Sequence, residues 1–150
     1  MKLNEVLRGP IVALNRWLIA AVVVALLLRL HCLFFPYLWL DEYVTLWSIG
    51  GSTYAEMFER AIYWTASAPL FVLCYRMSWD LVGNAEWGMK LPGIFAGTLN
   101  VVAMWWAVRK LFLRENVAIV AAWLVALDPQ FVHYSQEARP YVGTVLFSTM

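Results

Sequence analysis

The sequence is poor in charge and in cysteine. Charged side chains make up only 14% of the 150 residues, whereas hydrophobic side chains make up 63%; soluble domains usually carry about a quarter charged residues. The net charge of +1 comes without a basic cluster, which argues against a nucleic-acid partner. Two cysteines, Cys32 and Cys74, are too few for a disulfide framework, and we expect both to be packing residues.

What the sequence has instead is long apolar runs, enough for a membrane-spanning helix of roughly 20 residues. We predict an all-α integral membrane fold with three complete spans, at about 11–33, 87–108 and 116–133, and the start of a fourth from 141. The first run carries Arg29 and lacks a small-residue cleavage site, so we interpret it as a retained anchor and not a signal peptide. The last run ends before it could cross. We therefore expect residues 1–150 to be the N-terminal transmembrane module of a longer protein.

Basic residues mark the ends of these runs. Lys2, Arg8 and Arg16 precede the first span, and Arg109-Lys110 with Arg114 follow the second. Positive residues concentrate on the cytoplasmic side of membrane proteins. The pattern predicts a multi-pass protein of the cell (inner) membrane, with its N-terminus in the cytoplasm.

The loop at 36–85 is predicted to lie outside the cell. Gly50-Gly51 would end one short helix, and Thr53 with Glu56 forms a capping box that would open the next. The following apolar residues share one helical face, which is typical of a helix lying in the membrane interface.

The stretch from Pro69 to Val82 is apolar but short. It contains Arg76 and Asp80, four residues apart, and this pair would be costly at the bilayer centre. We predict a second interfacial helix that does not cross the membrane, stapled by its own Arg76–Asp80 pair.

The first polar motif is Leu38-Trp39-Leu40-Asp41-Glu42-Tyr43, at the point where the first span leaves the hydrocarbon. A carboxylate beside apolar surface is expensive unless it is hydrated, paired or metal-bound, so Asp41 and Glu42 are functional candidates. The alternative is that Asp41 caps the following helix and Glu42 favours its positive end.

The second polar motif, Tyr134-Ser135-Gln136-Glu137-Ala138-Arg139-Pro140-Tyr141, separates two apolar helices. Pro140 disfavours helical geometry at Arg139 and suits the first turn of a helix. A helix N-terminus attracts phosphate, and Arg139 would add a planar fork of donors. The alternative is a simple Glu137–Arg139 pair that secures a turn.

Three stretches together resemble a known family. They are the sequences at 38–47 and 134–141, which contain the two motifs, and Ala85-Glu86-Trp87-Gly88-Met89-Lys90-Leu91-Pro92-Gly93. In order and spacing they are similar to the multispanning C-type glycosyltransferases that use polyprenyl-phosphate sugars, particularly the bacterial dolichyl-phosphate-mannose-protein mannosyltransferase-like group. One departure is Ser67-Ala68-Pro69-Leu70, where the family often has His-Pro-Pro-Leu.

The resemblance implies an extracytoplasmic site that moves a hexosyl or pentosyl group, with inversion, from a polyprenyl-phosphate donor to a glycan, lipid or protein acceptor. A base for the acceptor hydroxyl and cations for the phosphate would suffice for this chemistry. The implied residues are Asp41 and Glu42 as catalytic acids, Glu137, Arg139, Lys90 and Tyr141 at the substrate, and Asp41 with Glu137 as ligands of a divalent cation, Mg²⁺ or Mn²⁺. Packing near the headgroups would explain Lys90 equally well.

Two rival functions remain open: a noncatalytic membrane subunit that docks a partner, and a small ion-coupled transporter. Transporters place charges near the midplane, whereas both motifs here lie at the outer boundary, which favours the transferase.

Five other residues have structural interpretations. Neither His31 nor His133 has metal-ligand spacing, so both are expected to take polar interface roles. Arg29 is expected to extend toward the headgroups. Gly93 and Gly97 should permit close helix packing.

The charge bias makes a topology prediction. In a background without Cys32 and Cys74, a cysteine at position 110 should resist an impermeant thiol reagent in intact cells, and a cysteine at position 137 should react. Labelling of position 110 in intact cells would contradict the assigned orientation.

Overall fold

The computed structural model describes residues 16–34, 37–65, 67–83 and 85–150, and these residues form helices and no strand. Eight of the described helices are α-helices, η1 and η3 are 3₁₀-helices, and η2 is a π-helix. In chain order they are α2 (Arg16–Leu30), η1 (His31–Phe34), α3 (Leu40–Ile49), α4 (Tyr54–Glu59), η2 (Arg60–Trp64), α5 (Pro69–Leu81), η3 (Glu86–Lys90), α6 (Leu91–Phe112), α7 (Glu115–Leu127), α8 (Pro129–Ser135) and α9 (Tyr141–Thr149).

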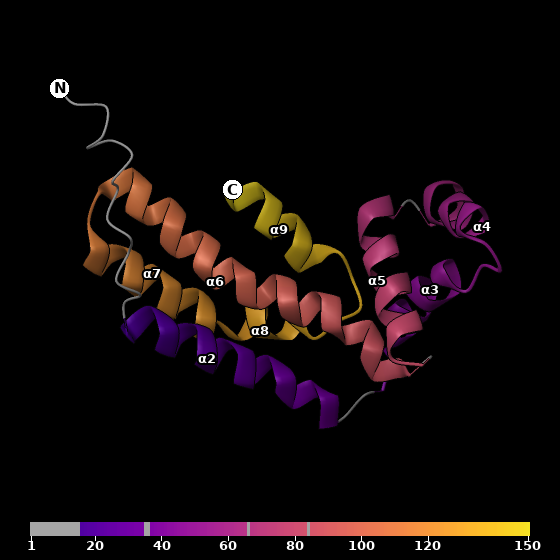
Figure 1. Ribbon diagram of the computed structural model, residues 1–150, viewed down its shortest axis with the longest axis horizontal. Helices are drawn as coiled ribbons and strands as arrows, with labels where there is room; N and C mark the ends of the chain where they lie inside the picture. Colours follow the sequence, from indigo (N-terminus) through magenta and orange to yellow (C-terminus); the bar gives the residue numbers. More distant parts are fainter. Residues whose placement is uncertain (1–15, 35–36, 66, 84) are drawn as a thin grey trace.

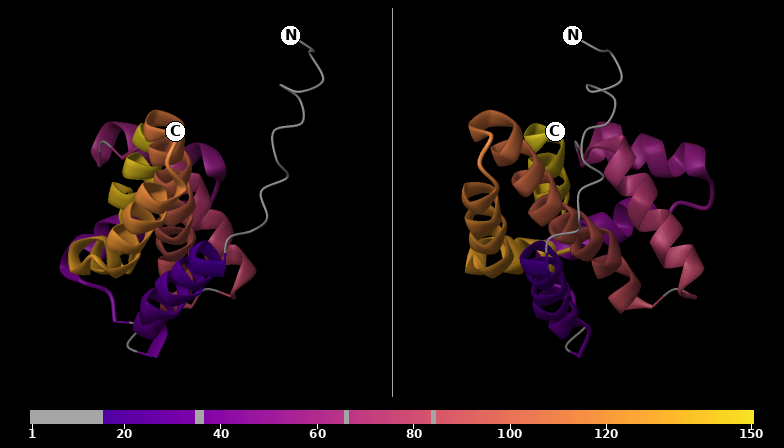
Figure 2. Two further views of the ribbon diagram at one scale, coloured as in Figure 1. Left: turned by 90° about the vertical axis from the view of Figure 1, so that its left-hand side faces the viewer. Right: turned by 60° about the vertical axis from the view of Figure 1, so that its left-hand side comes forward.

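Helices α2, α6 and α7 pack side by side as an elongated bundle, and α9 lies against α6 on the side away from α2 (Figures 1 and 2). Small side chains dominate the bundle core and let the helix backbones approach closely. The core residues are Leu18, Ala21, Ala25, Val101, Trp105, Ala118, Ala122, Val125 and Ala126. Large apolar side chains such as Leu27, Phe95 and Leu124 point outward instead, as expected for lipid-facing surfaces.

Two continuous helical stretches are long and apolar enough to cross a membrane, Arg16–Phe34 and Glu86–Phe112. They correspond to the predicted spans at 11–33 and 87–108, although residues 11–15 of the first lie outside the described residues. At the predicted span 116–133 the helix bends by 59° between Leu127 and Pro129, so this stretch is either a broken span or a re-entrant loop. Taken as one broken span, α7 and α8 would be the third crossing.

The break has a local cause. Pro129 occupies the first turn of α8 and has no backbone N–H to continue α7. The Asp128 side chain accepts a hydrogen bond from the Phe131 amide at 2.9 Å and so caps the new helix. Asp128 and Pro129 therefore end one helix and start another.

Helices α3, α4 and α5 form a second cluster at one end of the bundle (Figure 1). Its buried residues are Leu38, Ile49, Met57, Ala61, Val72, Tyr75, Met89 and Ala138. The predicted stop at Gly50 is confirmed, because Gly50 is the C-cap of α3. Thr53 caps α4 as predicted, but Glu56 does not return to the Thr53 amide; it accepts from the Ser52 amide at 2.8 Å.

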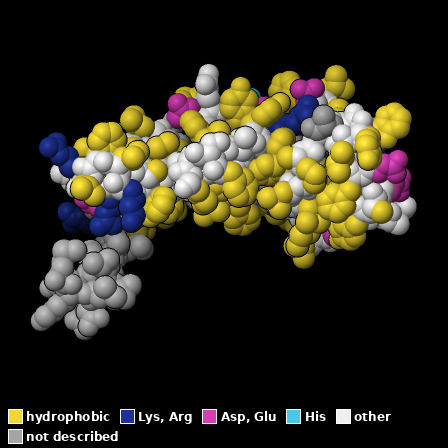
Figure 3. Space-filling view, turned by 90° about the horizontal axis from the view of Figure 1, so that it is seen from above, with side chains coloured by type: hydrophobic (Ala, Val, Ile, Leu, Met, Phe, Trp, Pro, Cys, Tyr) yellow, Lys and Arg dark blue, Asp and Glu magenta, His cyan; other side chains and the backbone are white. Residues whose placement is uncertain are grey.

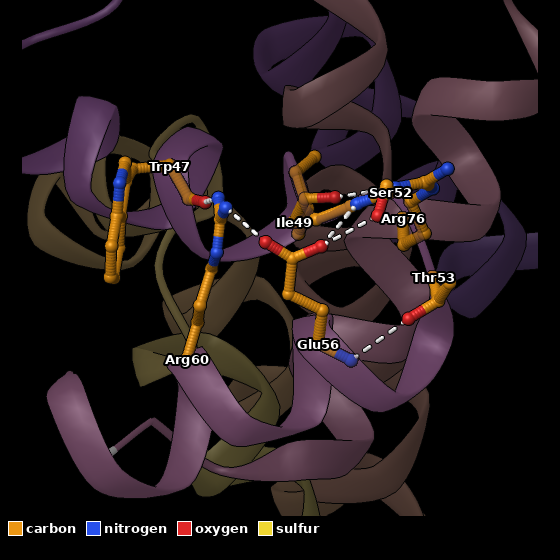
Figure 4. Close-up of polar contacts among 8 residues, drawn as sticks. Trp47, Ile49, Ser52, Thr53, Glu56, Arg60 and Arg76 are labelled. Atoms are coloured by element: carbon orange, nitrogen blue, oxygen red, sulfur yellow. Dashed lines mark hydrogen bonds and ion pairs between the residues drawn. The ribbon is translucent and has the colours of Figure 1, made fainter.

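Arginine side chains tie the three helices of this cluster together (Figure 4). Arg60 pairs with Glu56 and donates to the Trp47 carbonyl at 3.0 Å. Hydrogen bonds from Ser52 hold the pKa of Glu56 below its ordinary value. The hydrogen bonds between Ser52 and the ionised Glu56 carboxylate therefore stabilise the fold at neutral pH, and this stabilisation is lost as the pH falls through the lowered pKa of Glu56.

Helix α5 runs steeply across the direction of α2 and α6 (Figure 1). Its 13 residues give a length of about 20 Å, less than the roughly 30 Å of a hydrocarbon core. Arg76 pairs with Asp80 at 2.9 Å as predicted, and also donates to the Ile49 and Gly51 carbonyls at 2.6 and 2.8 Å. The Arg76–Asp80 pair thus anchors α5 to the end of α3 as well as bracing its own helix.

Charge is distributed unevenly along the molecule. Lys and Arg side chains gather at the end that carries the turn between α6 and α7, and a smaller group of them shows toward the end formed by α3 to α5 (Figure 3). Within this turn Arg109 pairs with Glu115 at 3.0 Å, and Leu113 adopts a left-handed φ of 53°. The basic turn and the two polar motifs therefore lie at opposite ends of the bundle.

Two other predictions about single residues are wrong. Arg29 does not reach the surface: its side chain is fully buried among α2, α7 and α8, and donates to backbone carbonyls and to Ser135. The backbone carbonyls at the end of α7 lie within hydrogen-bond distance of Arg29, so its guanidinium binds them in place of lipid headgroups. Cys32 is buried as expected, but Cys74 is exposed on α5.

The predicted role of Gly93 and Gly97 is confirmed. A Cβ on Gly93 would lie 2.7 Å from the Ser135 carbonyl oxygen, and one on Gly97 would overlap the Ser135 hydroxyl and lie 2.7 Å from Arg29 Nε. Helix α6 thus approaches the second motif closely only because these residues lack side chains.

Gly97→Leu should consequently lower the free energy of unfolding by roughly 1–3 kcal/mol, the usual cost of overpacking a core. Val102→Leu, on an exposed face of α6, is the matched control. Thermal melts of both variants in detergent provide the measurement, and equal melting temperatures would contradict the close packing.

Candidate functional site

The second polar motif forms a turn between α8 and α9 that four helices hold in place. Helix α2 contacts its first half, since Gln136 donates to the Leu28 carbonyl at 2.9 Å. Helix α6 packs on its backbone at Gly93. Helices α3 and α5 contact its second half through Glu42 and Tyr75.

Glu42 joins the two motifs, which are 96 residues apart. Its side chain is buried, with one oxygen accepting from the Ala138 amide at 2.6 Å and the other from the Trp39 amide at 2.7 Å. Trp39 is the N-cap of α3, so Glu42 supplies the returning half of a capping box. The alternative prediction that Asp41 caps this helix is therefore wrong; Asp41 lies within the first turn.

Asp41 and Arg139 meet across the same junction. The Asp41 carboxylate lies 3.3 Å from Arg139 Nη2, and the two side chains are 76% and 20% exposed. Arg139 Nε is buried and has no hydrogen-bond partner among the described residues. Arg139 thus faces an open carboxylate with Nη2, while its Nε is enclosed by protein.

Tyr75 fixes the backbone at this point. Its hydroxyl donates to the Arg139 carbonyl at 2.7 Å. Burial raises the pKa of Tyr75 well above its ordinary value, so the phenol stays protonated and remains a donor.

Glu137 lies at the centre of the site. It lines three cavities of about 560, 680 and 420 Å³, and Asp41 lines the latter two with it. Its carboxylate pairs with His133 Nε2 at 3.2 Å. Within the described part of the chain Arg139 pairs with Asp41 and not with Glu137, so the alternative of a simple Glu137–Arg139 pair is wrong.

Lys90 lines one of the three cavities that Glu137 lines. It is 5% exposed, donates to the Tyr37 carbonyl at 3.2 Å, and lines the 560 Å³ cavity together with His31 and His133. An ammonium group has three donors, and one of them is used by this bond. Lys90 is therefore a buried cation facing a cavity, not a surface residue among headgroups.

Tyr141 begins α9 and is half exposed. Its ring meets that of Tyr134 edge-on at 5.6 Å, and both rings line the 680 Å³ cavity with Asp41 and Glu137. The structure thus brings all six predicted site residues to one end of the bundle.

The arrangement combines an open carboxylate, a cation with spare donors and aromatic walls. Such a site can hold an anionic group and accept a proton from a neighbouring hydroxyl. No group of three or more His, Cys, Asp or Glu side chains converges on a metal position within the residues described. Asp41 and Glu137 nevertheless line the same two cavities, so a cation that takes other ligands from a substrate fits their chemistry.

Sequence reasoning missed two contributors to the site, Tyr75 and Arg29. Nothing local marks Tyr75, because its partner lies 64 residues away. Arg29 did carry a signal: an arginine inside an apolar run is rare, and such residues usually face a protein interior.

Comparisons with known proteins give one match. The sequence model of the dolichyl-phosphate-mannose-protein mannosyltransferase family matches residues 66–150, which is more than half of the chain. The match includes Lys90 and the second motif, and the first motif lies outside it. No curated protein and no solved structure matches the chain.

Because Glu42 holds the two motifs together, Glu42→Gln should lower the free energy of unfolding by about 1–3 kcal/mol, the cost of leaving a buried amide without its acceptor. Because glutamine keeps one acceptor oxygen for two amides, the Ala138 or the Trp39 amide should also lose protection from hydrogen exchange. Glu59→Gln on exposed α4 surface is the control. Identical melts and identical exchange of both amides in the two variants would exclude this role of Glu42.

Proposed function

Because this chain belongs to the dolichyl-phosphate-mannose-protein mannosyltransferase family, we propose that it transfers a sugar from a polyprenyl-phosphate donor to an acceptor hydroxyl at the junction of its two polar motifs. The acceptor is a glycan, lipid or protein outside the cytoplasm. The observation that carries the proposal is the meeting of Asp41 and Arg139, 3.3 Å apart, beside the cavities that Glu137 lines.

Asp41 is the proposed base. In the reaction the acceptor oxygen attacks the anomeric carbon, and the bond from that carbon to the phosphate oxygen breaks, leaving its electron pair on the polyprenyl phosphate. Attack opposite the leaving group inverts the anomeric centre. Asp41 accepts the hydroxyl proton, a role that its exposure to the cavity supports better than the buried Glu42, whose two oxygens already bind amides.

Arg139 and Lys90 are the proposed phosphate ligands. Arg139 lines the 420 Å³ cavity, and its planar fork suits phosphate oxygens. The nine-residue helix α9 begins beside it, so the positive end of the helix dipole adds to the attraction. Lys90 would contribute a second positive charge from the 560 Å³ cavity that it lines with Glu137. Tyr141 forms part of the wall against which the donor lies.

A divalent cation, Mg²⁺ or Mn²⁺, is compatible with this site. Mg²⁺ is usually held by one or two carboxylates together with substrate phosphates, and Asp41 and Glu137 would be its ligands from the protein. When bound, the cation would neutralise charge on the departing phosphate. Without it, Arg139 and Lys90 supply the positive charge.

The site is proposed to face the outside of the cell membrane. The basic turn at Arg109-Lys110 lies at the far end of the bundle from both motifs (Figure 3), which supports a cytoplasmic turn and an outer site. The rival transporter function has less support. Arg29, buried in one described span, bonds to backbone carbonyls and a serine, and Lys90, buried at the start of the other, donates to the Tyr37 carbonyl.

Two substitutions test the proposed roles in the intact protein. Asp41→Asn keeps the shape but loses the base, so turnover should fall by roughly 10²–10⁴ while donor binding survives. Arg139→Lys keeps a positive charge but loses the fork, so it should weaken donor binding as well as turnover.

The measurements are sugar transfer from a radiolabelled polyprenyl-phosphate donor and donor binding, with Glu59→Gln as the control and thermal melts to verify folding. Near-normal transfer by folded Asp41→Asn would remove Asp41 from the mechanism and leave Glu137 as the open acid.

A further inference from the structure

Arg29 is a charged side chain buried in a membrane-spanning helix, and its partners define what it does. Nη2 lies 3.4 Å from the Val125 carbonyl oxygen, and Nη1 lies 3.4 Å from that of Ala126 and 3.0 Å from that of Ala25. These three acceptors are backbone groups, two of them in the last turn of α7. No acid pairs with Arg29 among the described residues.

The last turn of α7 needs such a donor. In a continuous helix the Val125 carbonyl would accept from the amide of residue 129, but that residue is proline and has no N–H. The partner of Ala126 would be Gln130, which belongs to α8, beyond the 59° bend. Carbonyls left open in an apolar environment cost several kcal/mol each, and a cation is favoured at the negative end of a helix. Arg29 therefore stabilises the break between α7 and α8.

The same guanidinium also reaches the second motif. Arg29 Nε donates to the Ser135 hydroxyl at 3.0 Å, and that hydroxyl in turn donates to the Phe131 carbonyl. The neighbouring residue of α2, Leu28, accepts from Gln136. The C-terminal turn of α2 thus fixes the two motif residues that precede Glu137, as Glu42 and Asp41 fix the two that follow it.

We propose that Arg29 is a positioning residue of the transfer site: by capping the broken end of α7 and holding Ser135, it sets where Glu137 and Arg139 stand. The inference rests on the proposed function only for its effect on turnover. The planar guanidinium matters because one group reaches four acceptors in different directions, which an ammonium group cannot reproduce.

Arg29→Met, Arg29→Lys and the control Arg16→Met in the full chain test the proposal. Arg16 is exposed at the other end of the same helix. Arg29→Met should raise amide hydrogen exchange in residues 129–139 by about tenfold while exchange in 40–65 stays within about twofold of wild type. Sugar transfer should fall by roughly 10²-fold, as for a site displaced by about 1 Å. Arg29→Lys should recover part of the exchange protection and part of the transfer rate, and Arg16→Met should change neither quantity.

The proposal is overturned if residues 129–139 exchange at the wild-type rate in the Arg29→Met variant, or if exchange rises equally along the whole chain. If Arg29→Met does not fold, Ser135→Ala decides, because it removes one link and leaves the arginine in place. Several-fold slower transfer is then expected, and an unchanged rate counts against the proposal. If the wild-type chain itself transfers no sugar from a polyprenyl phosphate, the proposed function fails. The exchange pattern alone then tests whether Arg29 positions the second motif.

Discussion

The hydrogen bond from the Ala138 amide to the buried Glu42 carboxylate is the contact on which the site depends. It joins the start of α3 to the turn before α9 across 96 residues. A buried carboxylate is tolerated only when its oxygens are satisfied, and both oxygens of Glu42 accept from backbone amides. The same contact places the neighbouring residues, Asp41 and Arg139, opposite one another. The residues proposed to bind the donor and accept the proton thus lie next to a pair whose role is structural.

The membrane explains why so much of the site is held by backbone groups. In hydrocarbon every carbonyl and amide must find a partner within the protein, and a broken helix is possible only where side chains replace the missing bonds. Asp128 satisfies the start of α8, and Arg29 satisfies the end of α7. The break in turn lets the chain turn aside and present Glu137 to three cavities.

Local signals in the sequence predicted much of the fold. Apolar length identified the first two spans, Gly50 ended a helix where expected, and Pro140 precedes α9. The two motifs were predicted to share one side of the membrane, and the structure brings their side chains into contact. The predictions that failed depended on distant partners: three of the four acceptors of Arg29 lie about 100 residues away, and Tyr75 contacts Arg139 from another helix. A capping residue followed by proline, Asp128-Pro129, is a local signal for the start of a new helix. The apolar residues on both sides of it led instead to the prediction of a span at 116–133.

The central claim is that the two motifs build one donor site at a single end of the bundle. The most direct measurement is photo-crosslinking of the full protein in membranes with a polyprenyl-phosphate sugar that carries a diazirine on its sugar, followed by peptide mapping. The account predicts crosslinks to both 37–42 and 134–141, which excess unlabelled donor suppresses. Crosslinks confined to one of these segments, or found at the basic turn around residues 109–114, would contradict it.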